Sequence, residues 1–167
     1  TKVIITLGTS WCFRNVTGGQ IVSNCLKRPA AEFVRERLSS EESASCLHSI
    51  MEMCAATVSE DFLPKEFIFT VSPIRHFKDG AHGNQISKAT LLLGIEEVLS
   101  EGCAYFPAYE IVMDELRDYR FYAEDMCHPS QQTIDYIRER FLDWALAKEE
   151  RLQLEENIRN YRRSCHR

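Results

Sequence analysis

Two residues that can share a proton, Asp125 and His128, stand three positions apart in the segment EDMCHPS. A carboxylate at this spacing on a tight turn can accept a hydrogen bond from one imidazole nitrogen. That bond fixes the tautomer of the ring and leaves the other nitrogen to act as a general base. The spacing alone fits equally well a surface turn at Asp125 and a helix N-cap at His128, with Pro129 in the first helical position.

A general base of this kind supports acyl transfer only beside a nucleophile. Ser10 follows a strand-like run, but Trp11 comes next, whereas the serine of a nucleophile elbow lies between glycines. Cys12 and Cys127 offer thiols, yet Cys127 is adjacent to His128, so the two side chains should diverge and the thiol should be buried. The sequence therefore contains a candidate base without an evident nucleophile.

A second group of potential ligands occupies the polar loop RHFKDGAHGN. His76, Asp79 and His82 could ligate a metal, with Asp125 as a further ligand. No second cluster follows at a recognised metal-site spacing, which favours a solvated polar loop. We therefore expect neither a metal nor a cofactor.

Strand-like and helix-like segments alternate along the chain. Compact apolar runs at 2–7, 66–74 and 103–112 predict three strands of a parallel sheet. Helices are expected over 29–38, over 39–58 behind a capping box formed by Ser39 and Glu42, over 85–100, and from Pro129 onward. This order is typical of an α/β fold with right-handed crossovers.

Binding sites in open α/β sheets collect beyond the carboxyl ends of the strands. The loops that follow the three predicted strands should meet there in one crevice. The polar residues expected around it are Ser10, Ser72, Arg75, His76, Asp79, Asn84, Asp125 and His128.

Several of the side chains near this crevice have more than one possible role. Arg75, Lys78 and Lys88 could bind an anionic group, or could form salt bridges with acidic neighbours. Asn84 is the best amide donor near the crevice, and it also fits the N-cap of the helix that follows.

Composition limits the class of protein. A chain of 167 residues with 44% hydrophobic and 27% charged residues suits one globular domain, and no apolar run approaches the roughly 20 residues needed to cross a membrane. The net charge of −5 argues against a nucleic-acid partner. Seven scattered cysteines without a CxxC pair, and no visible signal peptide, favour a cytoplasmic location.

Beyond single residues, long blocks of the chain resemble the GSCFA-domain family, a branch of the SGNH (GDSL-like) hydrolase superfamily. The blocks are VIITLGTSWCFR, NCLKRPAAEF, VSPIRHFKDGAHGNQISKATLL, YFPAYEI and MDELRDYRFYAEDMCHPS. They follow the order of the later two-thirds of the family and cover nearly the whole chain. The resemblance implies a flavodoxin-like three-layer α/β/α sandwich with a parallel sheet. It also assigns the catalytic acid and base of the DxxHP block to Asp125 and His128.

The chain departs from the family pattern at two places. The Gly-Ser-Cys-Phe-Ala motif, whose serine corresponds to the superfamily nucleophile, is absent from the 167 residues. The position similar to the Gly-x-Asn-Asp block, which supplies an oxyanion-hole asparagine, reads Gly8-Thr9-Ser10-Trp11. The residues left as candidates for an oxyanion hole or pocket are Gly8, Thr9, Ser10, Asn84, Arg75 and His76.

The resemblance therefore predicts part of a serine esterase that acts on an ester or acetyl group of a carbohydrate-like or lipid-like substrate. We expect a partial SGNH-like domain over 1–147 and a charged helix over 148–167 that packs on it or extends from it. The missing nucleophile fits either a fragment of a longer hydrolase or a natural truncation, and the retained Asp125–His128 pair with its supporting loops favours the fragment. Such a fragment should be inactive alone and prone to self-association through a sheet edge. The alternative is a non-catalytic binding or assembly module with a degenerate pocket.

Overall fold

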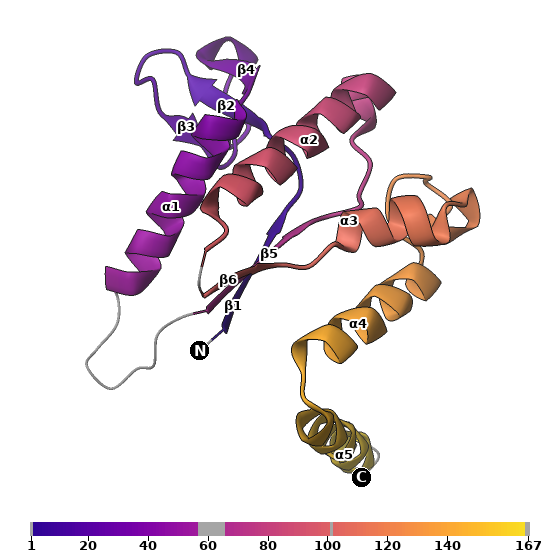
Figure 1. Cartoon of the computed structure of the whole chain (residues 1–167). Helices are drawn as coiled ribbons and strands as arrows, with labels where there is room; N and C mark the ends of the chain where they lie inside the picture. The colour runs from indigo at the N-terminus through magenta and orange to yellow at the C-terminus, as the bar shows by residue number, and fades with distance from the viewer. Residues whose placement is uncertain (1, 57–65, 101, 166–167) are drawn as a thin grey trace.

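The structure is a computed structural model, and it describes residues 2–56, 66–100 and 102–165 (Figure 1). Its main sheet has three parallel strands in the order β1-β5-β6: β1 (Lys2–Leu7), β5 (Glu66–Val71) and β6 (Cys103–Tyr105). The central position of β5 explains why its apolar run is interrupted only by Thr70, because both of its faces are buried. The predicted mixed α/β class with a parallel sheet is confirmed.

Helices cover both faces of the main sheet. Phe67, Phe69 and Val71 of β5 point toward α1 (Ser40–Ala56) and α2 (Gly80–Val98), which lie side by side on one face (Figure 1). Ile68 points the opposite way, toward Phe106 and the first turn of α3 (Ala108–Glu110). Because successive side chains of β5 point to opposite faces of the sheet, this one strand contributes to two separate apolar clusters.

The third strand is shorter than the sequence predicted. Pairing of β6 with β5 ends at Tyr105, and the segment 108–112, expected to be strand, is helical. Pro107 stands at the change, and it lacks the N–H group that a longer strand would donate. A π-helical turn (Ile111–Leu116) continues α3, and a 3-10 turn (Tyr119–Phe121) follows it.

A small antiparallel sheet lies beyond the carboxyl end of β1. It has the order β3-β2-β4, with β2 (Trp11–Asn15), β3 (Ile21–Val22) and β4 (Phe33–Arg37). The helix predicted over 29–38 was wrong: only a 3-10 turn (Ala30–Glu32) forms, and then β4 begins. Pairing with β2 overrides the weak helical pattern, and an Arg14–Glu36 ion pair joins the two strands.

The first long helix begins as the sequence predicted. The Ser39 N–H donates to the Glu42 carboxylate (2.8 Å), and the Glu42 N–H donates to Ser39 Oγ (3.1 Å), which completes a capping box. The predicted end of this helix at residue 58 lies outside the described residues. The start of α2, by contrast, was predicted five residues too late. Asn84 therefore lies inside the helix rather than at its N-cap.

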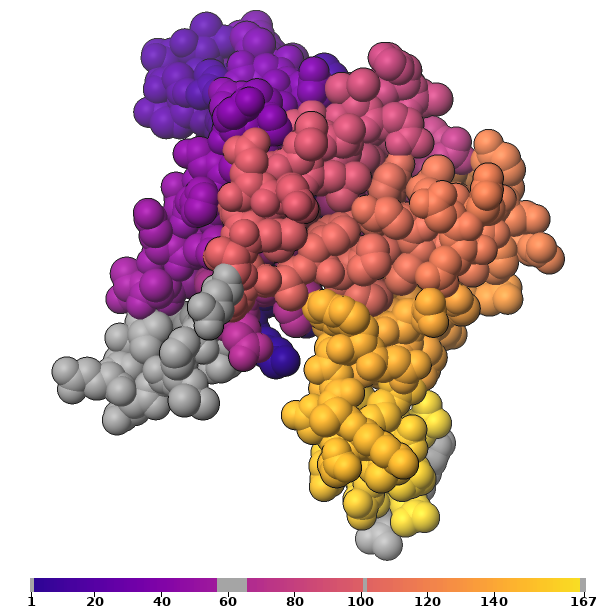
Figure 2. All heavy atoms as spheres, in the orientation of Figure 1, coloured from indigo at the N-terminus to yellow at the C-terminus, as the bar shows by residue number. Residues whose placement is uncertain are grey.

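The last two helices are α4 (Gln131–Ala145) and α5 (Lys148–Cys165). The N-cap of α4 is Ser130, whose hydroxyl accepts from the Thr133 N–H, so the alternative in which His128 caps this helix is wrong. In Figures 1 and 2 the two helices form an arm that extends away from the sheet. Arg151 of α5 ties the arm together through ion pairs with Glu139 and Asp143 of α4.

The β1 edge of the sheet is open, and so is the part of the second face that β1 forms. Among the described residues, β1 pairs with β5 alone, and Ile4 on the side away from α1 and α2 is 54% exposed. Self-association at this edge stays a prediction. Within the described ranges, no helix combines the length and the apolar character that crossing a membrane requires.

Candidate active site

The loop that carries Asp125 and His128 is a short folded unit. The Ala123 N–H donates to the His128 carbonyl (2.7 Å), and the Ser130 N–H donates to the Phe121 carbonyl (2.9 Å). Tyr122 and Pro129 form an isolated antiparallel bridge between these two bonds. The loop therefore closes on itself like a small hairpin before α4 begins.

Within this loop the two oxygens of Asp125 have separate tasks. Oδ1 accepts from the backbone N–H groups of Cys127 and His128, each at 2.9 Å, which makes an Asx turn. Oδ2 lies 2.5 Å from Nδ1 of His128. Met126 adopts a left-handed conformation (φ 58°) that lets the chain turn back tightly enough for both contacts. The expected hydrogen bond between the two side chains is present in the structure.

The charge state of the pair follows from these contacts. The hydrogen bond from His128, followed by the two backbone N–H groups, lowers the pKa of Asp125 from 3.8 to about 2. The carboxylate is therefore ionised at neutral pH and can only accept, so Nδ1 of His128 carries the proton. The His128 side chain is 61% exposed, and no described residue hydrogen-bonds its Nε2. A lone pair on Nε2 is thus open to solvent.

The loop that carries the Asp125–His128 pair, here called the dyad loop, is joined to the segment that follows β5. The Arg75 N–H donates to the Cys127 carbonyl (3.1 Å), and the Cys127 thiol donates to the Arg75 carbonyl (2.7 Å). Nη1 of Arg75 also donates to the Met126 carbonyl (3.1 Å). The Cys127 thiol therefore donates to Arg75 rather than to His128, as expected if the two side chains diverge.

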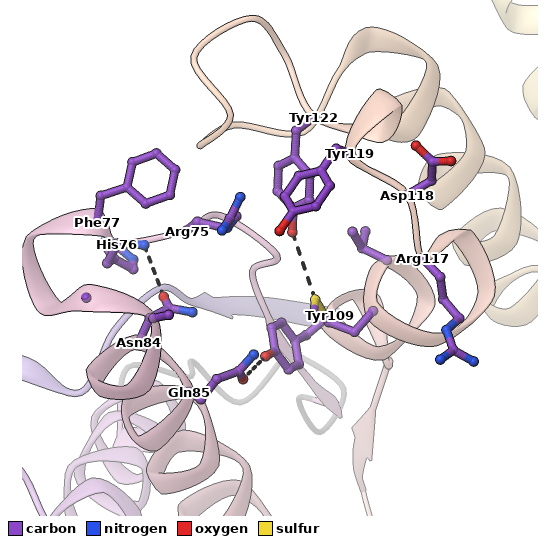
Figure 3. A pocket seen from close by; sticks show the side chains of 14 residues that line it. Arg75, His76, Phe77, Asn84, Gln85, Tyr109, Arg117, Asp118, Tyr119 and Tyr122 are labelled. Atoms are coloured by element: carbon purple, nitrogen blue, oxygen red, sulfur yellow. Dashed lines mark hydrogen bonds between the residues drawn. The ribbon is translucent and has the colours of Figure 1, made fainter.

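A pocket of about 400 Å³ opens on the other side of Arg75 (Figure 3). It lies at the carboxyl ends of β5 and β6, where sites in parallel sheets collect. Its walls come from the β5–α2 segment, the start of α2, the helical stretch after β6, and the 3-10 turn. The lining residues are Arg75, His76, Phe77, Gly80, Ala81, Asn84, Gln85, Tyr109, Val112, Met113, Arg117, Asp118, Tyr119 and Tyr122.

The structure brings together only some of the residues predicted around one crevice. Arg75, His76 and Asn84 line the pocket. Asp125 and His128 are not among the lining residues; the residues between them, Met126 and Cys127, hydrogen-bond to Arg75 of the pocket wall. The remaining candidates lie deeper or elsewhere: Gly8, Thr9, Ser10, Ser72 and Asp79.

The Gly8-Thr9-Ser10 turn is fixed by Ser87 of α2. Both the backbone N–H and the hydroxyl of Ser10 donate to Ser87 Oγ (2.8 and 3.1 Å), and Thr9 Oγ1 lies 3.0 Å from the same atom. Ser10 is 1% exposed, so its hydroxyl is shielded from any reactant. This geometry gives Ser10 a structural role and no path to His128.

Lys88 connects two strand ends beneath the pocket. Its ammonium donates to the carbonyls of Gly8 (2.5 Å) and Ser72 (2.7 Å). Nε2 of His76 lies 3.1 Å from the same Gly8 carbonyl. Burial lowers the pKa of Lys88 to about 8, and burial together with the charge of Lys88 lowers the pKa of His76.

Two of the three loop residues proposed as metal ligands have other partners. Nε2 of His76 lies near the Gly8 carbonyl, and the buried Asp79 carboxylate pairs with Arg35 of β4. Across the part of the chain that the structure describes, no group of three or more His, Cys, Asp or Glu side chains is placed to hold a metal ion.

Sequence reasoning missed the aromatic walls of the pocket. Tyr109 comes from a segment predicted as strand, and Tyr119 and Tyr122 come from the charged stretch DELRDYRFYAED, which suits a loop or a short helical turn. The three meet only because the chain folds back over the end of the sheet. The high density of tyrosines in AYEIVMDELRDYRFY was the available signal. Aromatic side chains concentrated in a polar loop are typical of binding surfaces.

Comparison with known proteins gives one finding. Searches of curated proteins and of solved structures each returned no match. The family model described as GSCFA family matches residues 1–141, which include both sheets, the pocket and the Asp125–His128 loop. The chain therefore belongs to the GSCFA family.

Proposed function

We propose that this chain carries the acid–base half of an SGNH-type serine esterase. One observation carries the proposal: Oδ2 of Asp125 lies 2.5 Å from Nδ1 of His128, while the opposite ring nitrogen is solvent-accessible. An imidazole held in one tautomer by an ionised carboxylate is the base that serine hydrolases use.

In the proposed reaction Nε2 of His128 removes the proton of a serine hydroxyl as the serine oxygen attacks the ester carbonyl. Asp125 stabilises the imidazolium that forms, and stays ionised itself. His128 then returns the proton to the departing alcohol, which leaves an acyl-serine. Water hydrolyses the acyl-serine by the same proton transfers in reverse order.

The serine in this scheme comes from outside the described residues. Ser10 is buried and bonded to Ser87, and no described serine hydroxyl lies within hydrogen-bonding distance of Nε2 of His128. For the oxyanion, the Ser10 N–H is already committed to Ser87 and the Trp11 N–H to Thr9. The side-chain amide of Asn84 is the candidate donor whose N–H groups have no described partner.

The substrate in this proposal is a small ester or an acylated, carbohydrate-like molecule. The pocket volume of about 400 Å³ is within the range of small-molecule sites, and its mixture of tyrosine, amide and arginine side chains suits a polar ring. Proximity of this pocket to the dyad loop, through Arg75, supports its use as the substrate site.

A second candidate function is a non-catalytic binding or assembly module. The observation in its favour is that Asp125 and His128 do not line the pocket. In such a module the pocket would bind its ligand without any reaction, and the dyad would only stabilise the loop.

Labelling with a fluorophosphonate probe separates the two candidates. The complete natural polypeptide that contains residues 1–167 should be labelled at a serine other than Ser10. His128→Ala should lower the labelling rate by at least about 100-fold, because general-base catalysis contributes 10²–10⁴-fold. His48→Ala, at an exposed position on α1, is the matched control and should leave the rate unchanged.

Two results would contradict the esterase proposal. Labelling at Ser10 would show that the nucleophile is misassigned. Absence of labelling, or labelling that persists in His128→Ala, would support the binding module instead.

A further inference from the structure

Arg75 presents an unneutralised guanidinium to the pocket. Its guanidinium carbon lies 4.9 Å from the ring centre of Phe77 and 5.4 Å from the ring centres of both Tyr119 and Tyr122. Figure 3 shows the side chain between Phe77 on one side and the two tyrosines on the other. Within the described residues, no carboxylate lies within 4.0 Å of it, and its one hydrogen bond goes to the Met126 carbonyl. Most of its five N–H donors are therefore unused.

The neighbouring polar groups add further donors without acceptors. Oδ1 of Asn84 accepts from the His76 N–H (3.0 Å), which leaves the amide N–H groups of Asn84 facing the pocket (Figure 3). Gln85 is similar, because its Oε1 accepts from the Tyr109 hydroxyl and its amide nitrogen has no partner among the described residues. An excess of donors around a cavity favours a ligand that is rich in acceptors.

The single carboxylate in the pocket wall is already occupied. Asp118 accepts from the Arg120 N–H (2.9 Å) and pairs with the Arg120 guanidinium (3.4 Å). Arg117 also borders the pocket, but its guanidinium points away from the cavity in Figure 3. The charge that faces the cavity is thus the positive charge of Arg75, although the whole chain carries a net charge of −5.

The pocket also offers flat apolar surfaces at its mouth. Phe77 is 53% exposed and Tyr119 is 63% exposed. Exposed aromatic faces next to amide donors can hold one face of a sugar ring, while the amides bind its hydroxyl groups. The flanking aromatic rings also hold the Arg75 guanidinium in place, so little side-chain freedom is lost when a ligand binds.

We propose that this pocket binds a sugar bearing an oxyanion, carboxylate or phosphate, with the Arg75 guanidinium paired to the anionic group. The inference rests on the proposed function in that it identifies the substrate class of the same site. Asn84 and Gln85 donate to oxygens of the ring, and an aromatic face packs against it. The pocket thereby selects sugars that carry an anionic group over neutral sugars.

Calorimetric titration of the chain with three probes tests this inference. Glucuronate and glucose 6-phosphate carry the two possible anionic groups, and methyl glucoside is the neutral comparison. At least one acidic sugar should bind at least about tenfold more tightly than the glucoside, because a charge-assisted hydrogen bond is stronger than a neutral one. The tighter of the two identifies the anionic group.

Variants of Arg75 decide whether this residue is responsible. Arg75→Gln should abolish the preference for the acidic sugar, and Arg75→Lys should reduce it severalfold by removing the forked donor while keeping the charge. Arg163→Gln, on the exposed last turn of α5, is the matched control and should keep the full preference. Circular dichroism establishes whether each variant is folded. If Arg75→Gln does not fold, the result for Arg75→Lys decides the test.

The inference is overturned if neither acidic sugar binds, if the glucoside binds as tightly, or if the Arg75 variants keep the full preference. These outcomes are independent of esterase activity, because binding is read without turnover. Acidic-sugar binding without fluorophosphonate labelling would uphold this inference and reject the esterase. Labelling without an acidic preference would do the reverse.

Discussion

At the scale of single residues, the Asp125–His128 contact shows how a short segment can encode a chemical unit. The two side chains are three positions apart, so the Asx turn that Asp125 makes with the backbone also delivers the imidazole to its second oxygen. Every contact within the pair is local. The spacing alone fitted a surface turn and a helix N-cap equally well, and it was the resemblance to the GSCFA-domain family that favoured the pair.

The residues of the pocket behave differently. Arg75 and Asn84 were predictable because they follow a clear strand, but Tyr109 and Tyr122 reach the pocket from positions well beyond it in the chain. Their placement depends on where β6 ends and on the helical stretch that replaces the rest of the predicted strand. Long-range packing decides such positions, and local sequence patterns do not record it.

Lys88 gives a prediction about pH at the residue scale. NMR titration of the lysine side chains, assigned with Lys88→Arg, should show the Lys88 midpoint near pH 8 because burial disfavours its charged form. Since the folded pKa is below the ordinary 10.5, the unfolded chain binds more protons between about pH 8 and 10.5. The contribution of Lys88 to stability therefore rises with pH across this window and is lost as pH falls through 8. A midpoint near 10.5 would contradict the buried position.

At the scale of elements, the helices and strands that were predicted correctly are those with a strong local sequence signal. The capping box at Ser39 correctly predicted the start of α1, because two reciprocal hydrogen bonds fix that terminus. The segment 29–38 had no comparable signal, and pairing with β2 made it a strand. When a segment of ten residues has mixed periodicity, its secondary structure is decided by the strands that it pairs with rather than by its own propensity.

The contact between α1 and α2 gives a prediction about packing. A Cβ atom at Gly94 would lie 2.8 Å from Cβ of Ser43 and 3.0 Å from the Ser40 carbonyl oxygen. Overpacking costs about 1–3 kcal/mol, and the gain of roughly 1 kcal/mol in helix propensity offsets part of this cost, so Gly94→Ala should lower the free energy of unfolding by up to about 2 kcal/mol. Urea unfolding measures the change.

A neighbouring position provides the control for this packing prediction. Leu93 is 59% exposed on the same helix, so Leu93→Ala should change the free energy of unfolding by less than about 0.5 kcal/mol. A Gly94→Ala variant as stable as the wild type would show that the two helices are not in close contact at this point.

At the scale of the whole molecule, three loops from separate parts of the chain converge on one end of the parallel sheet. The turn after β1 is held by Ser87 and Lys88, the segment after β5 carries Arg75, and the dyad loop is joined to that segment. The α/β class was predictable from alternating strands and helices. The antiparallel sheet was not, because its pairings join short segments across intervening turns.

The position of Arg75 explains why the residues predicted around one crevice lie in two places, the pocket and the Asp125–His128 loop. Arg75 stands between the pocket and the Asp125–His128 loop, with its guanidinium toward the aromatic walls and its backbone bonded to Cys127. In the proposed esterase, the reacting carbonyl of a bound substrate has to reach past Arg75 to Nε2 of His128. The state of that ring is therefore the point on which the proposed function depends.

The tautomer of His128, observed by two-bond ¹⁵N–¹H NMR correlation at a pH where the ring is neutral, tests this claim most directly. We expect a proton on Nδ1, donated to the ionised Asp125, and an unprotonated Nε2. Asp125→Asn should remove this preference, whereas Asp135→Asn on the exposed surface of α4 should preserve it. A proton on Nε2 in the wild-type chain would rule out His128 as the general base, because that nitrogen could then not accept the proton of a nucleophile.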